Sequence, residues 1–320
     1  MDITVVLEQM GKLFLLLLLG VFLARIELLD LHTKQKLTKL LLYVTTPMMM
    51  IDAFHDRMLS LADQQDTGVS VGTLFADSFL FYAVLTVLSL VLVFCIRTPK
   101  EHRRLYLFMT IFGNVGFMGF PVVDSVYGKE GLFYAAIVNS VFNIIIYTFG
   151  VLLFGGASEG SGSLKEHLRT VPWKKLLLTP AVIATAAGVL IFVFRIRMPL
   201  LLADTCDSLG GLTSPLAMLV VGANLSVVPV RSVLSNLRLN VYVLLRQIAL
   251  PLLFWLILKQ FISHPVLAPT LLLLSCMPVA NTTALFATEY RGDEALASQG
   301  IFLTTLFSLV SFPLVIWLCC

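Results

Sequence analysis

The sequence predicts an all-α polytopic membrane protein with ten transmembrane helices in a 5+5 inverted repeat, with broken crossover helices in spans four and nine. Two observations predict this class. Of the 320 residues, 58% are hydrophobic and only 13% are charged, whereas soluble globular domains usually contain about 25% charged residues. Apolar segments long enough to cross a hydrocarbon core of roughly 30 Å also recur along the whole chain. This pattern excludes a soluble enzyme with a single membrane anchor.

The expected spans divide evenly between the two halves of the chain. In the first half they cover 5–24, 37–54, 71–96, 105–127 and 131–154. In the second half they cover 176–194, 200–225, 239–261, 266–288 and 295–318. Arg25 directly follows the first span, where a cleaved signal peptide would have small residues. We therefore expect the first span to remain in the mature protein.

Basic residues gather on one side of the predicted spans. The loops after spans one, three, five, seven and nine contain 15 of the 22 Lys and Arg residues. They are Arg25, Lys34, Lys36, Lys39, Arg97, Lys100, Arg103, Arg104, Lys165, Arg169, Lys174, Lys175, Arg231, Arg238 and Arg291. By the positive-inside rule this side is cytoplasmic, so both termini are expected on the non-cytoplasmic side of the cell membrane. The net charge of +3 is too small to indicate a nucleic-acid partner.

A glycine- and serine-rich stretch over 155–163 has the composition of a linker between two repeats. We expect a first five-helix repeat over 1–155, a cytoplasmic linker loop over 156–175 and a second five-helix repeat over 176–320. Because each repeat contains an odd number of spans, the second must enter the membrane in the opposite orientation. Short internal matches support this, since Thr45-Thr-Pro-Met48 is similar to Thr213-Ser-Pro-Leu216.

Glycine and proline interrupt the fourth and ninth spans near their centres. The fourth contains Gly113, Gly116 and Pro121, and the ninth contains Pro278. Proline removes a backbone donor and clashes with the carbonyl four residues earlier, so each helix must kink or unwind. Unwound backbone is tolerated inside a bilayer only where it is buried in protein or lines a wet cavity. Close helix packing is the alternative explanation for these residues.

Two opposed half-helices would direct their N-terminal amides, the positive ends of the helix dipoles, toward the point where the spans cross. This arrangement favours an anion. The predicted binding residues come from spans four, five and nine. They are Gly113, Asn114, Gly116, Pro121, Asn139, Asn143, Pro278, Val279, Asn281 and Thr282.

Asn139 and Asn143 are four residues apart and therefore share one face of span five. Thr304, Ser308 and Ser311 form a similar polar stripe in span ten. These side chains either complete the binding site or form interhelical hydrogen bonds, which are worth about 0.6 kcal/mol each.

Two charged residues inside the spans are candidates for support or coupling. Arg246 lies within span eight, where an unpaired charge costs at least about 2.5 to 3.5 kcal/mol. It either balances a bound anion, pairs with an acid such as Asp77 in span three, or extends its long side chain to the membrane surface. Asp77 is near the outer end of its span, where simple hydration would also stabilise it.

The motif Gly113-Asn-Val-Gly-Phe-Met-Gly-Phe-Pro121, with Tyr127-Gly-Lys-Glu-Gly-Leu132 and Pro278-Val-Ala-Asn281, resembles the auxin efflux carrier family of plant PIN-FORMED carriers and bacterial transporters. The resemblance covers essentially all ten spans. It implies a scaffold of spans one, two, six and seven and a mobile transport domain of spans three to five and eight to ten, which moves as an elevator. It also implies a support site at Asp77 and a homodimer. The long central loop of many plant members is missing, so auxin specificity is not expected.

These features together predict a secondary transporter of a small organic anion such as a carboxylate. The first alternative is a symporter or antiporter of the same fold coupled to Na⁺ or H⁺, with Asp77 carrying a proton. The second is a membrane sensor that binds a ligand without moving it. An enzyme is not expected, because the spans contain neither paired acids nor a histidine cluster. The expected partners are the substrate and membrane lipid, without a metal, another cofactor or nucleic acid.

Overall fold

The computed structural model describes residues 3–62, 70–155, 177–226, 236–290 and 292–319. The expected linker loop over 156–175 lies outside the described residues. So do some of the basic residues that predicted the orientation, namely Lys165, Arg169, Lys174, Lys175, Arg231 and Arg291.

The regular elements in the described part of the first half are all helices, including three π-helical turns labelled η. The elements are α1 (Ile3–Arg25), α2 (Leu31–Leu40), η1 (Leu41–Thr45), α3 (Thr46–Ala62), α4 (Val71–Cys95), α5 (Arg103–Ile111), η2 (Val115–Gly119), α6 (Phe120–Ile145), η3 (Ile146–Gly150) and α7 (Val151–Gly155). The helices α2 and α3 are continuous through η1.

The regular elements in the described part of the second half are helices as well. The elements are α10 (Pro180–Val193), α11 (Leu200–Gly211), α12 (Thr213–Leu225), α14 (Leu237–Leu244), η4 (Leu245–Ala249), α15 (Leu250–Leu258), α16 (Leu267–Ser275), α17 (Thr282–Glu289) and α18 (Glu294–Cys319).

Six helical runs in the described chain are long and apolar enough to cross a membrane. They are Leu31–Leu61, Val71–Cys95, Val115–Leu153, Leu200–Leu225, Leu237–Leu258 and Glu294–Cys319. The predicted all-helical architecture with several membrane spans is therefore confirmed. The count of ten spans and the 5+5 repeat stay predictions.

Proline determines where three of the long helices change their winding. The π-helical turns η1, η2 and η4 are each followed by a helix whose second residue is proline, at Pro47, Pro121 and Pro251. Proline cannot donate a backbone hydrogen bond, and its ring crowds the preceding turn. The wider π turn accommodates both effects, so the sequence itself specifies where these helices are irregular.

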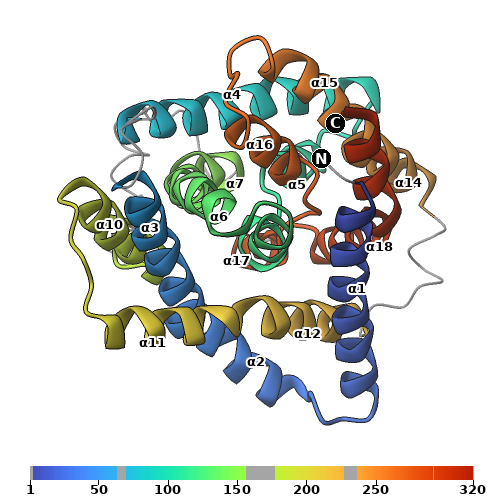
Figure 1. The fold of residues 1–320 in the computed structure, drawn as a ribbon. Coiled ribbons are helices and arrows are strands. Elements are labelled where there is room, and N and C mark those ends of the chain that lie inside the picture. Colours follow the sequence, from blue (N-terminus) through green and yellow to red (C-terminus); the bar gives the residue numbers. More distant parts are fainter. Residues whose placement is uncertain (1–2, 63–69, 156–176, 227–235, 291, 320) are drawn as a thin grey trace.

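The helices α1 and α12 pack with their backbones in close contact. A Cβ atom at Gly20 would collide with the backbone of Leu219, and one at Gly222 would collide with the carbonyl of Leu17. Small residues permit this approach, which is typical of helix pairs in membranes. Figure 1 shows α3, α10, α11, α12 and α1 following one another around the molecule, with α5, α6, α16 and α17 inside and α4 and α15 on the opposite side.

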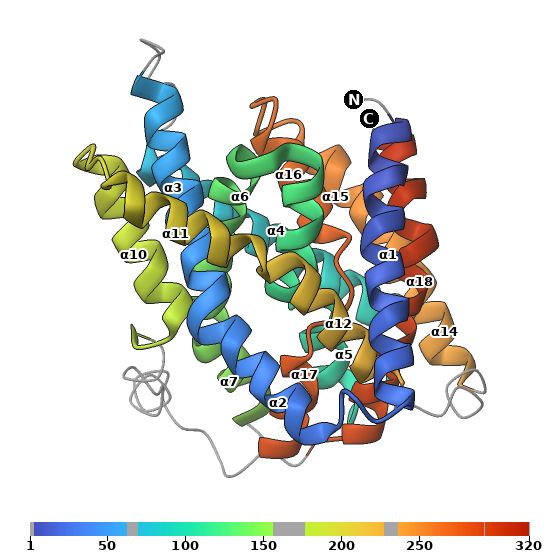
Figure 2. The same cartoon turned by 60° about the horizontal axis from the view of Figure 1, so that its bottom comes forward.

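Figure 2 shows both chain ends on one face of the molecule, which we call the termini face. We call the opposite face, where α1 ends at Arg25 and α18 begins at Glu294, the basic face. The helix α6 turns sharply at Gly128, whose φ of 58° and ψ of −152° lie outside the helical region. Glycine adopts this positive φ without steric cost. The two arms of α6 therefore run in different directions, and the turn between them lies at the termini face (Figure 2).

Candidate functional site

Two helices end inside the molecule, and the segments that follow them pair with each other. The helix α5 ends at Ile111 and α16 ends at Ser275. The backbone N–H of Asn114 donates to the carbonyl of Pro278 at 2.7 Å, and the N–H of Ala280 donates to the carbonyl of Phe112 at 3.0 Å.

These bonds form an isolated antiparallel bridge between Gly113 and Val279. Each break thereby satisfies backbone groups that the other break has freed, as burial in an apolar medium requires. Gly113 is also closely surrounded, because a Cβ atom there would lie 3.3 Å from Nη2 of Arg246 and 3.3 Å from the carbonyl oxygen of Met277. A Cβ atom at this position would require these neighbours to move by a few tenths of an ångström.

Arg246 caps the two helices that end at the breaks. Its side chain is only 2% exposed. Nε donates to the carbonyl of Met109 in the last turn of α5 at 3.3 Å, and Nη1 donates to the carbonyl of Ser275 at the end of α16 at 3.4 Å. The last carbonyls of a helix have no partner within it and carry its negative dipole charge. One guanidinium therefore serves two helix ends.

Arg246 neither reaches the membrane surface nor pairs with Asp77 in the described structure, although the sequence allowed both. Its burial shows that the side chain does not extend to the membrane surface. Within the described residues the ion pairs do not include one between Arg246 and Asp77. Asp77 is half-buried near the start of α4. Arg246 also forms a side-chain hydrogen bond with Tyr242, one turn earlier in the same span. The sequence could not indicate the capping role, because the capped carbonyls belong to remote segments.

Span ten holds the second break in place. The N–H of Val279 donates to the hydroxyl of Thr304 at 3.0 Å, and Gln247 Nε2 donates to the carbonyl of Thr304 at 2.9 Å. Gln247 is fully buried, and its Oε1 has no hydrogen-bond partner in the described part of the chain. Gln247 was not among the predicted site residues, although a glutamine beside a buried arginine inside an apolar span is a signal for it.

The two half-helices that begin after the breaks differ at their N-termini. At η2 the side chain of Asn114 accepts a hydrogen bond from the N–H of Phe117 at 3.1 Å, so the turn has a cap. At α17 the corresponding residue, Asn281, makes no side-chain cap bond. The hydroxyls of Thr282 and Thr283 are buried and have no partner in the described residues. The positive end of α17 is thus the one with unsatisfied polar groups.

A cavity of about 270 Å³ contains Asn281 on the basic-face side of the breaks. It is lined by Val221, Asn224, Leu225, Asn281, Ala284, Ser298, Ile301, Phe302 and Thr305. These residues come from the end of α12, from α17 and from the first half of α18, which places the cavity toward the basic face. The lining mixes apolar side chains with neutral amides and hydroxyls and contains neither acids nor bases. Below we call it the polar cavity.

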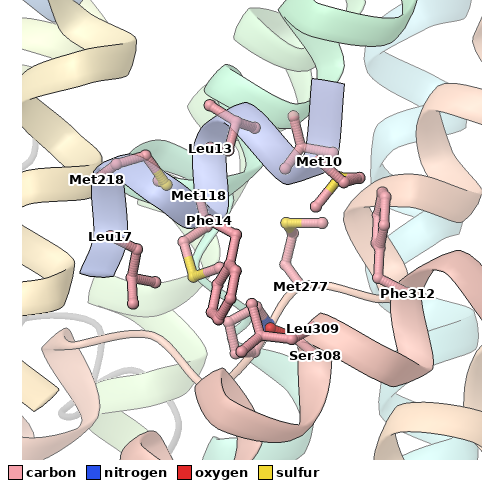
Figure 3. A pocket seen from close by; sticks show the side chains of 12 residues that line it. Met10, Leu13, Phe14, Leu17, Met118, Met218, Met277, Ser308, Leu309 and Phe312 are labelled. Atoms are coloured by element: carbon pink, nitrogen blue, oxygen red, sulfur yellow. The ribbon is translucent and has the colours of Figure 1, made fainter. Parts of the chain in front are cut away.

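A much smaller pocket, of about 20 Å³, lies on the termini-face side of the same breaks. Figure 3 shows the side chains of Met10, Met118 and Met277 around it, with Phe14 and Phe312 beside them. Pro278 also lines this pocket. The break in span nine therefore separates an open polar cavity from a nearly filled apolar one.

The remaining predicted residues have several different surroundings. Gly116 is half-buried, and a Cβ atom there would face open space. Pro121 is buried as the second residue of α6. Asn143 donates from Nδ2 to the carbonyl of Asn139 at 2.7 Å, within its own helix. The lining residues of the polar cavity and of the apolar pocket include neither Asn139 nor Asn143.

Comparison with known proteins identifies the family. A family model described as membrane transport protein matches residues 5–316. An uncharacterised transporter of Methanocaldococcus jannaschii is 28% identical over 218 residues, which are 66% of each chain. A candidate malonate transporter of Rhizobium meliloti is 23% identical over 72% of this chain and 71% of its own length. An uncharacterised transporter of Methanothermobacter thermautotrophicus is 30% identical over 63% of each chain.

The alignments to the two archaeal relatives thus span slightly less than two thirds of those proteins. The family match, in contrast, covers nearly the whole chain, and the relatives are named as transporters. The chain therefore belongs to the membrane transport protein family, the auxin efflux carrier family of the motif resemblance, and it is a membrane transporter rather than an enzyme.

Proposed function

We propose that this transporter is a secondary carrier of a small organic anion, most simply a carboxylate, which binds where the breaks of spans four and nine meet. The single observation that carries this proposal is the uncapped N-terminus of α17, where Asn281 lies in the polar cavity and the hydroxyls of Thr282 and Thr283 have no partner in the described chain.

The charges around the breaks favour a negative solute. The N-terminus of a helix has a partial positive charge, which favours anionic groups. In the first turn of α17 the N–H groups of Thr283 and Ala284 already donate to the carbonyls of Ala280 and Asn281, so this end offers its dipole and its side chains. The buried guanidinium of Arg246 adds a full positive charge at the same breaks, although it already hydrogen-bonds to two carbonyls and to Tyr242. Because the polar cavity is lined without an acid, a cation would find little there to replace its hydration shell.

The name of one relative agrees with this charge preference. The Rhizobium meliloti protein is described as a candidate malonate transporter, and malonate is a small carboxylate. At 23% identity this relative supports the class of substrate and leaves the individual compound open.

We further propose that the chain works by alternating access on a ten-span inverted repeat. The close contact of α1 with α12 and the packing of α3 against α10 and α11 support a rigid scaffold of spans one, two, six and seven. Spans three to five and eight to ten would then move as the transport domain. On this proposal the basic face is cytoplasmic, both termini are outside the cell, and two scaffolds associate as a homodimer in the cell membrane.

Uptake into proteoliposomes tests the proposal directly. We expect saturable uptake of labelled malonate or lactate, and we expect Asn281→Ala and Thr282→Ala each to weaken substrate affinity by about tenfold, the value of a hydrogen bond to a charged group. Thr205→Ala is the matched control, because Thr205 is exposed on α11 and its hydroxyl donates to the carbonyl of Leu201 in its own helix. Unchanged uptake by both site variants would refute the site.

The same vesicles separate the alternatives. A carrier coupled to Na⁺ or H⁺ would respond to imposed gradients of that ion, and Asp77→Asn would remove the response if Asp77 carries the proton. A sensor would bind the carboxylate, as a thermal shift of the purified protein would show, without any accumulation in the vesicles.

A further inference from the structure

The turn of α6 at the termini face is fixed to two other helices by a shared lysine. Lys129 directly follows the positive-φ residue Gly128. Its Nζ lies 3.0 Å from Asp52, 2.9 Å from Asp56 and 2.9 Å from Asp207. Asp52 and Asp56 are one turn apart on α3, and Asp207 is on α11. One cation thus joins the tip of α6 to both helices.

A second contact follows immediately in the sequence. Glu130 lies 2.9 Å from Nη1 of Arg57 on α3. Arg57 also donates from Nη2 to the hydroxyl of Tyr134 at 3.2 Å, and that hydroxyl lies 3.3 Å from Nε2 of His264 in the loop before α16. Two neighbouring residues of opposite sign on α6 therefore pair with residues of opposite sign on α3. We call the pairs made by Lys129 and Glu130 the ionic latch.

Two of the partners on α3 are largely buried, which makes their contacts more consequential than ordinary surface ion pairs. The side chain of Asp52 is 9% exposed and that of Arg57 is 15% exposed. A charge that is largely removed from water depends on its partner, and removing the partner leaves it uncompensated. Without Lys129, the carboxylates of Asp52, Asp56 and Asp207 would also repel one another across the gap between α3 and α11.

The ionic latch lies on the opposite side of the breaks from the polar cavity. The polar cavity lies toward the basic face, and the apolar pocket toward the termini face holds only about 20 Å³. The latch joins α6, which the proposed function assigns to the transport domain, to α3 and α11, which it assigns to the scaffold. Contacts of this kind must separate when one domain moves past the other.

We propose that the ionic latch stabilises the state that is open toward the basic face, and that its release is required before the site opens toward the termini face. This inference rests on the proposed alternating access and adds the contacts that set the balance between its two states. A contact that is present in only one of two states shifts their populations by its full differential free energy.

Paired cysteine reporters test the ionic latch without any substrate. In a full-length protein whose native cysteines are replaced by serine, Met118→Cys reports on the apolar pocket and Ser298→Cys reports on the polar cavity. Each is labelled with a membrane-impermeant maleimide in lipid nanodiscs. We expect Lys129→Met to raise the labelling rate at position 118 by about tenfold and to lower the rate at position 298.

Matched variants separate loss of the latch from damage to the fold. Lys129→Arg keeps the charge and should retain the original rates. Lys12→Met is the control, because Lys12 is on α1 and its bond among the described residues is to Gln9, at 3.5 Å. If Lys129→Met is poorly folded, the additional change Asp52→Asn removes the buried charge while the latch remains broken, and the reciprocal change in rates should persist.

The outcomes also distinguish the latch from the transport proposal. If labelling at both positions rises together, the variant has loosened locally and the latch proposal is overturned, as it is if neither rate changes. If the rates change reciprocally but no carboxylate is taken up by vesicles of the unmodified protein, the substrate proposal fails while the latch stands.

Discussion

The two helix breaks are similar in sequence but differ in what they leave unsatisfied. In both, a helix ends beside Arg246, an extended stretch follows, and an asparagine precedes the next helix. Asn114 uses its side chain to cap η2, whereas Asn281 leaves the start of α17 uncapped inside the polar cavity. On the proposed function, the first break supports the fold and the second binds the substrate.

We expect the largest effect from replacing Arg246, whose side chain caps the helix ends at both breaks. Arg246→Met would leave the carbonyls of Met109 and Ser275 buried without their donors, at about 1 to 3 kcal/mol each, so we expect a loss of about 3 kcal/mol in the free energy of unfolding. Thermal unfolding in detergent measures this, with Arg197→Met as the control because Arg197 is exposed. Equal stability of the two variants would show that the caps contribute little.

Exchanging the two asparagines for alanine would sharpen the comparison most directly. Asn281→Ala should weaken carboxylate binding by about tenfold with little change in stability. Asn114→Ala should lower the free energy of unfolding by about 1 kcal/mol, the usual value of a helix cap, and Asn114→Ser should restore it. Titration calorimetry and thermal unfolding of the three variants measure both quantities. The comparison fails if both alanine variants lose affinity and stability alike.

We expect a smaller loss of stability from replacing Thr304, which contacts only the second of the two breaks. Thr304→Val keeps the shape of the side chain and removes the acceptor for the N–H of Val279, so we expect a loss of about 1 kcal/mol in stability. Thr205→Val is the control on an exposed helix face. Hydrogen exchange of the Val279 amide should become faster in Thr304→Val and stay unchanged in the control.

The smallest expected effect concerns pH and lies outside the breaks. Burial lowers the pKa of His264, whose Nδ1 accepts hydrogen bonds from the N–H groups of Val266 and Leu267. The pKa of His264 in the folded state is below the unfolded value of roughly 6.5, so the folded state favours the neutral imidazole. The contribution of neutral His264 to the free energy of unfolding is therefore complete above pH 6.5 and is lost as the pH falls through the lowered pKa.

Melting temperatures measured between pH 8 and pH 5 would reveal this contribution. We expect His264→Gln to show a smaller decrease in melting temperature than the unmodified protein as the pH falls. An identical decrease in both proteins would assign the pH dependence to other groups.

The sequence predicted the parts of this arrangement that depend on local backbone chemistry. Apolar segments of sufficient length predicted the helices themselves, and Pro278 lies in the break of span nine. In span four the expected position was wrong, because the break lies at 112–114 and Pro121 follows it inside the helical run that begins at Val115. The π-helical turn η2 accommodates this proline, so it predicted an irregular span without giving the place of the break. The role of Arg246 was not predictable, because its acceptors Met109 and Ser275 are backbone atoms of segments far away in the chain. Asn114 and Asn281 occupy equivalent positions in the two halves of the sequence, so the sequence did not indicate that one caps its helix and the other does not.

In span five, the spacing of the two asparagines predicted which helix face they share but did not predict their hydrogen bonds. Asn139 and Asn143 share a face as expected, yet Asn143 bonds to the carbonyl of Asn139 in the same helix. Asn224 and Ser298, which line the polar cavity, were not predicted because isolated small polar residues in apolar spans give no signal of their direction. Only the packing of α12, α17 and α18 brings them together.

The mutual pairing of the breaks also constrains how the protein can be made in a cell. In the described part of the chain, the N–H of Asn114 pairs with Pro278 and the carbonyl of Phe112 pairs with Ala280, and a ribosome synthesises both of these partners much later. Until that segment emerges, the early half of the chain cannot complete its hydrogen bonding within the lipid. Biogenesis must therefore hold the first half in an unfinished state, and a chain truncated before Pro278 should be a substrate for membrane quality control.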